Sequence, residues 1–161
     1  MKKYQIVPAC EGFKKLNMPK IEDKEFRNQL IGIHFDLLDE KEAYEKAIEK
    51  IKSVYITEPI QKRAEEFEKL RSEYITETDD GKKAELEKRL NTEFSDVHNA
   101  TTDYQKKVNE LGQEEVNIGT VSKKKFREEY IKQDYSAAVV ENLHPMLADD
   151  PAEEKKPKKK E

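Results

Sequence analysis

The side chains in this sequence that could take part in chemistry are mostly carboxylates on long charged stretches. Glu42, Glu45 and Glu49 recur at spacings of three and four residues, and residues 65–68 hold a second group. Helical enzymes that hydrolyse nucleotide pyrophosphates hold magnesium with such carboxylates, which must then face inward. Here the acids lie beside or opposite the apolar stripe of the helix, and nearby lysines four residues away can pair with them. Solvated helix faces are therefore the better interpretation.

Histidine and cysteine, the other common metal ligands, are scattered along the chain. His34, His98 and His144 lie on different segments, and none has a second His or Cys at ligand spacing. We therefore predict no metal site and no cofactor. The one cysteine, Cys10, has the position of a core residue rather than a nucleophile. It cannot form an intramolecular disulfide, which favours a reducing cytoplasm.

Motifs that mark nucleotide binding or hydrolysis are missing from the sequence. The chain has no GxxxxGK, GxGxxG, GxSxG or HExxH, and we expect no enzymatic activity. Residues 123–127 (KKKFR) are the most basic segment before the tail and could contact phosphate, although an exposed helix face explains them more simply. A net charge of -4 argues against a dedicated nucleic-acid binder.

The composition indicates slender helices rather than a thick globular core. Of the 161 residues, 41% are charged and 35% are apolar, and the apolar residues are ordered rather than scattered. We expect a single elongated helical domain over residues 1–148. Residues 149–161 hold five acids and five lysines, and we expect a disordered charged tail there. No apolar run approaches the roughly 18 residues of a membrane span.

Two long stretches with helical periodicity define the predicted fold, which is mainly α. Residues 23–56, which Asp23 can cap, and residues 82–111 each carry one apolar stripe, and Gly32 suggests a close approach of another helix. In the first stripe, residues 30, 37, 44 and 51 repeat every seven positions, as in a coiled coil. We predict a long antiparallel helical hairpin or three-helix bundle. The expected contacts join Leu90, Phe94, Val97, Tyr104 and Val108 to Leu30, Leu37, Tyr44, Ile48 and Ile51.

A third helix is expected over residues 59–78, with Pro59 ending or kinking the helix before it. A turn at residues 76–81 leads into the helix of residues 82–111, which Gly112 is expected to end. If the third helix packs incompletely, its aromatic residues and one near the bend stay partly exposed. Tyr55, Phe67 and Tyr74 are therefore a candidate protein interface, and self-association is its simplest form.

Short elements are expected at both ends of the chain. Residues 3–7 and 115–121 have strand character and could pair beside the end of the bundle. A short helix over residues 9–16 would bury Cys10, Phe13 and Leu16. Ser122 and Ser136 can cap two closing helices, the first of which would turn Phe126, Tyr130 and Ile131 inward.

The order of these features resembles a family of small helical proteins of unknown function encoded by tailed phages and prophages. The resemblance covers about residues 9–147. It includes the Leu-x-x-Pro step at 16–19, the sequence YEKA at 44–47, VNELGQEEVNI at 108–118 and ENLHPML at 141–147. It implies a phage origin and carries no catalytic residues to transfer.

The function expected from the sequence is a non-enzymatic protein–protein interaction. The chain would serve as an assembly helper, a minor particle component or a binder of a host protein. Its partner would be a phage or host protein or a second copy of the chain, in the bacterial cytoplasm or on the virion. A nucleic-acid-associated accessory protein is the alternative, and a magnesium-dependent enzyme acting on nucleotides is a third hypothesis.

Overall fold

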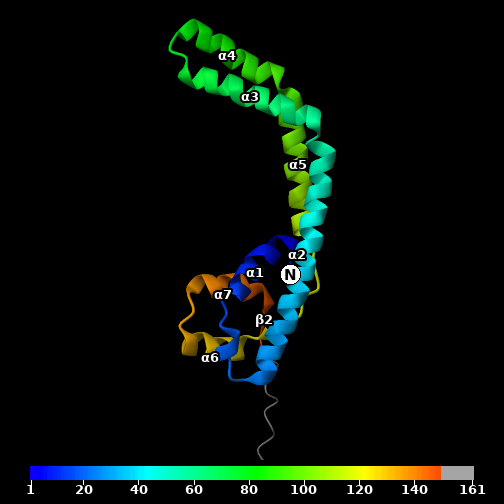
Figure 1. Cartoon of the computed structure of the whole chain (residues 1–161), viewed down its shortest axis with the longest axis vertical. Helices are drawn as coiled ribbons and strands as arrows, with labels where there is room; N and C mark the ends of the chain where they lie inside the picture. The colour runs from blue at the N-terminus through cyan, green and yellow to red at the C-terminus, as the bar shows by residue number, and fades with distance from the viewer. Residues whose placement is uncertain (150–161) are drawn as a thin grey trace, which may run out of the picture. The chain divides into compact units, whose positions relative to one another are not determined.

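The structure is a computed structural model that describes residues 1–149, and it is mainly helical, as predicted (Figure 1). Contacts group the chain into two compact units, Ala43–Glu114 and Met1–Glu42 with the segment that begins at Glu115. Helix α2 (Lys24–Tyr55) contributes residues to both units. The domain boundary at residue 148 stays a prediction. Apart from Asp149, the tail predicted to be disordered lies outside the described residues.

The first unit contains most of the short elements. They are η1 (Lys3–Gln5), α1 (Ile6–Lys14), η2 (Met18–Lys20), β1 (Val121–Ser122), α6 (Lys123–Gln133), α7 (Ala137–Leu143), η3 (His144–Met146) and β2 (Leu147–Ala148). Helix α1 packs closely on α7 (Figure 1). A Cβ atom at Gly12 would lie 2.9 Å from side-chain carbons of Leu143, so only glycine fits without a shift. The core of this unit includes Ile6, Cys10, Phe13, Phe26, Leu30, Leu37, Phe126, Val139, Leu143 and Met146.

The strand predicted for residues 3–7 is wrong, because residues 3–5 form the short helix η1 and residues 6 and 7 begin α1. Ile6, Ala9, Cys10 and Phe13 share one buried helix face, so the helical period extends further back than Pro8. Of the predicted pairing between the chain start and residues 115–121, the structure has one antiparallel bridge, between Lys2 and Glu115. The Met1 amino group donates to the Val116 carbonyl at 3.0 Å.

The strand predicted for residues 115–121 is correct only at its last residue. Within residues 1–149 the one sheet is parallel and pairs β1 with β2, in the register Val121 to Leu147. Ser122 then caps α6 as predicted, because its Oγ accepts from the Lys125 amide at 3.0 Å. Ile131 does not turn inward and is 69% exposed, which corrects that prediction.

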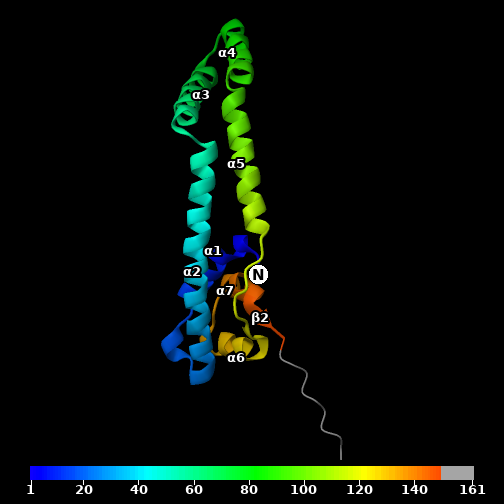
Figure 2. The same cartoon turned by 90° about the vertical axis from the view of Figure 1, so that its right-hand side faces the viewer.

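The second unit contains the end of α2 together with α3 (Glu58–Thr76), α4 (Asp80–Glu93) and α5 (Ser95–Gln113). Helices α3 and α4 form an antiparallel pair, drawn in green in Figure 1. Helix α5 runs alongside the last part of α2 (Figures 1 and 2). The core of this unit combines Leu70, Phe94 and Val97 with the partly buried Ala64, Phe67, Leu86 and Leu90.

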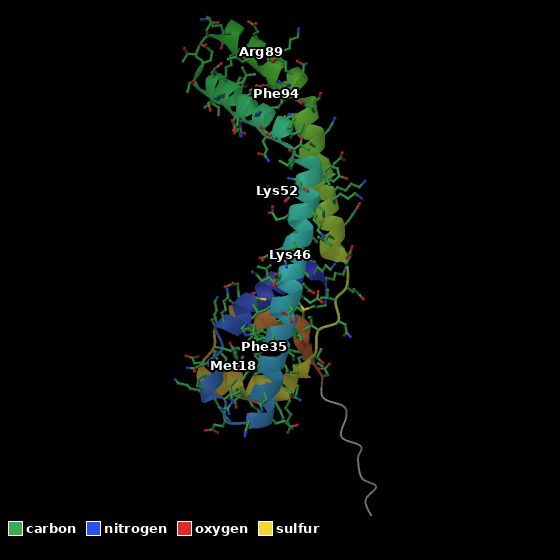
Figure 3. All side chains as sticks on the ribbon, turned by 45° about the vertical axis from the view of Figure 1, so that its right-hand side comes forward. Met18, Phe35, Lys46, Lys52, Arg89 and Phe94 are labelled. Carbon is green, nitrogen blue, oxygen red and sulfur yellow. The ribbon has the colours of Figure 1, made fainter. Side chains whose placement is uncertain are left out.

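The continuous helix predicted for residues 82–111 is wrong, because Phe94 interrupts it (Figure 3). Phe94 has φ -116° and ψ 28°, outside the helical region. Arg63 of α3 stabilises the break, since its guanidinium donates to the Glu93 carbonyl and lies 4.6 Å from the centre of the Phe94 ring. The same guanidinium contacts Asp96 in the first turn of α5 at 3.3 Å. Each of the two shorter helices thus has its own direction.

The predicted contacts of the hairpin are also wrong for its best-buried residues. Phe94 and Val97 pack against α3 within the second unit, whereas Leu30 and Leu37 belong to the core of the first unit. The seven-residue repeat of α2 therefore runs through both units, with residues 30 and 37 in the first unit and residues 44 and 51 in the second. Gly112 does not end its helix, since α5 continues to Gln113.

Candidate protein-binding surface

Helix α2 carries a second apolar stripe, formed by Ile31, Phe35 and Leu38, which we call the α2 stripe. Spacings of four and three residues place these side chains on one helix face. Their exposed fractions are 38%, 65% and 40%, and Figure 3 marks Phe35 on α2. The buried stripe that starts with Phe26 and Leu30 lies on a different face of the same helix. In its first part α2 is therefore apolar on two sides, and residues 1–149 cover only one of them.

The helix backbone is open beside the α2 stripe. A Cβ atom at Gly32 would have no neighbouring atom within 4 Å. The close approach of another helix that this glycine suggested is thus wrong for the described part of the chain. Gly32 lowers the steric bulk next to Ile31 and Phe35, so another helix could approach this face closely.

Opposite charges flank the α2 stripe at equal distances. Arg27 lies four residues before Ile31, and Glu42 lies four residues after Leu38. Arg27 is half-buried and its Nη1 donates to the Ile21 carbonyl at 3.1 Å. Glu42 is exposed and has an interaction of its own within the chain. The stripe therefore runs from a basic end to an acidic end.

Sequence reasoning identified the buried stripe of α2 and missed the exposed one. The signal was present, because residues 31, 35 and 38 follow the same helical spacing as the core positions. Two apolar stripes on one helix widen its apolar arc, and periodicity alone does not tell which stripe the chain itself covers. Burial in the folded structure makes that distinction.

The predicted interface residues Tyr55, Phe67 and Tyr74 are all half-buried in the second unit. Phe67 packs edge-on against Phe94 and His98, with ring centres 5.3 and 5.2 Å apart. The Lys83 ammonium lies 5.3 Å from the centre of the Tyr74 ring. Their role as an interface stays a prediction.

Phe67 and Tyr74 share a shallow hollow of about 410 Å³, and Tyr55 does not line it. The exposed Ile75 adds apolar surface there, while Arg71 and Glu87 add opposite charges. The structure thus brings two of the three predicted residues together on the paired helices α3 and α4. Part of the Phe67 ring is already in contact with Phe94 and His98 inside the chain.

A second hollow, of about 420 Å³, lies in the first unit between α6 and α7. Its apolar lining comes from Phe126, Tyr130, Ala137, Val140 and Leu147. Lys123, Arg127, Glu141 and His144 complete the lining. Lys123 also pairs with Asp149 at 3.3 Å, so this hollow lies beside the point where the described chain ends.

The histidines occupy three separate environments. His34 stacks on Phe13 with ring centres 5.0 Å apart, and its Nε2 atom is buried without a hydrogen-bond partner. Burial lowers the pKa of His34, and the positive charge of Lys14 adds to this effect. Among the described residues no three His, Cys, Asp or Glu side chains gather as metal ligands would. The Cys10 thiol is buried and donates to the Leu37 carbonyl at 3.8 Å.

The basic segment of residues 123–127 takes part in ion pairs within the first unit. Lys123 contacts Asp149, and Lys125 contacts Asp23 at 2.8 Å. The hydrogen bond from Lys125 lowers the pKa of Asp23, and the Phe26 amide, which Asp23 caps at 2.9 Å, lowers it further. Lys123 therefore links the start of α6 to Asp149, and Lys125 links it to Asp23, just before α2.

The acidic residues considered above as magnesium ligands, Glu42, Glu45 and Glu49, are all exposed on α2. No helix among residues 1–149 combines the length and apolar character needed to cross a bilayer. No protein-family model, curated protein or solved structure matches this chain.

Proposed function

We propose that this chain is a non-enzymatic protein that binds a protein partner through the α2 stripe. The exposure of Ile31, Phe35 and Leu38 on one face of a long helix is the observation that carries the proposal. Side chains at these spacings are the usual anchors when a helix lies in a groove or against another helix. Phe35 is the central anchor, because it is the largest and the most exposed of the three.

The energetic argument rests on apolar area that water still contacts. Covering apolar surface is worth about 25 cal/mol per Å², and an aromatic ring buries a large area at a low cost in side-chain entropy. Isolated exposed residues such as Val54 and Ile131 are ordinary on a protein surface. Ile31, Phe35 and Leu38 differ from these isolated residues because they lie next to one another on one helix face and offer a partner a continuous apolar surface.

The resemblance to a phage-encoded family supports a particular setting for this interaction. We propose that the chain is a phage or prophage protein that acts as an assembly helper, a minor particle component or a binder of a host protein. Its partner in these roles is a protein of the phage or the host. The hollow lined by Phe67 and Tyr74 is a second surface that such a partner could use.

Affinity capture from phage-infected or lysogenic bacteria tests this function. The baits are the full chain, Phe35→Ser, and Ile131→Ser as a matched control that removes an equally exposed apolar side chain elsewhere. A Tyr74→Ser bait tests the other surface. We expect the full chain, Ile131→Ser and Tyr74→Ser to retain the same protein, and Phe35→Ser to lose it.

Two results would contradict the proposed function. Capture of the same proteins by all four baits would show that the α2 stripe is not the binding surface. Loss of binding in Tyr74→Ser alone would move the interface to α3 and α4. Circular dichroism of each bait shows that the variants are folded.

A further inference from the structure

We propose that the partner which covers the α2 stripe is a second copy of this chain, paired with the first in an antiparallel, two-fold symmetric arrangement. This inference rests on the proposed function and names its partner. Two observations on the α2 face carry it: the spacing of the apolar residues, with Phe35 close to the midpoint between Ile31 and Leu38, and the opposite charges at the two ends.

The spacing of the stripe fits a two-fold axis close to Phe35. In an antiparallel pair of helices centred between residues 34 and 35, each residue faces the one whose number brings the sum to 69. Ile31 then faces Leu38 of the second copy. Phe35 lies at the level of His34 of the second copy, one position from that copy's Phe35, so the two Phe35 side chains lie close to the axis. A two-fold interface uses the same patch on both copies, so the three exposed residues of each copy cover one another.

The same register pairs the charges at the ends of the stripe. Residues 27 and 42 also sum to 69, so Arg27 of each copy faces Glu42 of the other. Both groups already have interactions within their own chain, and the guanidinium has further N–H groups to donate. A parallel pair would instead place Arg27 against Arg27 and Glu42 against Glu42, which is unfavourable. The charge pattern thus selects the antiparallel arrangement.

The backbone beside the stripe permits this approach. Gly32 has open space where a side chain would begin, so the second helix meets no Cβ atom at this position. Three apolar anchors per copy make a small interface, and small interfaces give weak, concentration-dependent association. The dimer therefore needs measurement over a wide concentration range, roughly 1–500 μM.

Analytical ultracentrifugation of the purified full chain tests the pairing. We expect the chain to pass from monomer to dimer within this range and Phe35→Ser to stay monomeric. Ile131→Ser, the matched control, should associate like the full chain. A full chain that stays monomeric throughout, or a Phe35→Ser variant that dimerises equally well, would overturn the proposal.

Charge reversal tests the antiparallel register. Arg27→Glu and Glu42→Arg should each weaken self-association at least several-fold, because each homodimer then holds two like-charged contacts. An equimolar mixture of the two variants should associate as strongly as the unmodified chain, because every contact in the mixed dimer joins Arg to Glu. Association of both single variants at the original strength, or no gain on mixing, would overturn the register.

These outcomes separate the inference from the proposed function. A purified chain that stays monomeric, combined with Phe35-dependent capture of a different protein, would overturn self-pairing and leave the proposed function standing. A monomeric chain whose capture does not depend on Phe35 would overturn both.

Discussion

Gly12 and Gly32 are both helical glycines, but their surroundings predict opposite effects of the same substitution. At Gly12 a methyl group would lie 2.9 Å from Leu143, whose side chain is fully buried between α1 and α7. At Gly32 it would meet nothing. We expect Gly12→Ala to lower the free energy of unfolding by about 1–3 kcal/mol through overpacking. We expect Gly32→Ala to raise it by about 1 kcal/mol through helix propensity.

Urea unfolding at a low protein concentration measures both changes. The two variants control for one another, because the chemical change is identical. A stabilised Gly12→Ala variant would mean that α1 and α7 do not pack closely. A destabilised Gly32→Ala variant would mean that this face of α2 is covered by something in the monomer.

His34 makes the stability of the fold depend on pH near neutrality. Burial beside Phe13 lowers its pKa below the usual value of about 6.5. Its neutral form is thus favoured in the folded chain, and the unfolded chain takes up a proton first as the pH falls. The contribution of His34 to the free energy of unfolding is fully present above the pKa that His34 has in the unfolded chain. It is lost as the pH falls through the pKa that His34 has in the folded chain.

Thermal unfolding of the full chain and of His34→Gln between pH 7.5 and 5.5 checks this prediction. We expect the melting temperature of the full chain to fall more steeply than that of the variant. Equal slopes would mean that His34 titrates normally in the folded chain, and a steeper slope in the variant would reverse the sign.

At the scale of elements, the break between α4 and α5 depends on one side chain of α3. Arg63 donates to the Glu93 carbonyl, pairs with Asp96 and lies over the Phe94 ring. We expect Arg63→Ala to lower the melting temperature and to speed amide exchange of residues 94–98. Arg71→Ala is the control, since on the same helix it removes only an exposed pair with Glu68 at 3.5 Å, a contact worth less than about 1 kcal/mol.

The Arg63 contribution also has a predicted pH dependence. The hydrogen bond from Arg63 lowers the pKa of Asp96 in the folded chain. The stabilising effect of the pair between Arg63 and Asp96 is present above the ordinary pKa of an aspartate. It is lost as the pH falls through the lowered pKa of Asp96 in the folded chain. The difference in melting temperature between the full chain and Arg63→Ala should therefore become smaller in strong acid. A gap that stays constant would mean that the pair with Asp96 contributes nothing.

The helices and several of their caps could be predicted because those signals are local. Asp23 and Ser122 occupy cap positions that the sequence alone identifies, and both accept the expected amide hydrogen bonds. The break at Phe94 could not be predicted, because Arg63 acts on it from 31 residues away in sequence. The strand prediction for residues 3–7 was wrong because Ile6 fits both the two-residue period of a strand and the 3.6-residue period of a helix. In the structure Ile6 is buried as part of the helix α1. The α2 stripe was visible as spacing, but its exposure depends on which face the other elements cover.

At the scale of the molecule, two cores of different character share one chain. The first unit buries many side chains completely, among them Phe26, Leu37 and Met146. In the second unit the cluster around Leu70, Phe94 and Val97 is completed by partly buried neighbours, as expected when slender helices each bury a single stripe. The seven-residue repeat of α2 hides this division, since its apolar spacing continues from one unit into the other.

Separate cores predict that core substitutions act locally. Leu37→Ala in the first unit and Phe94→Ala in the second each remove a large buried side chain and should cost about 2–5 kcal/mol. Units with their own cores can open independently. Native-state hydrogen exchange should therefore show Leu37→Ala speeding exchange at residues 6–13 and 126–146, and Phe94→Ala speeding it at residues 64–97. If either substitution sped exchange equally in both sets of residues, the chain would unfold as one cooperative unit.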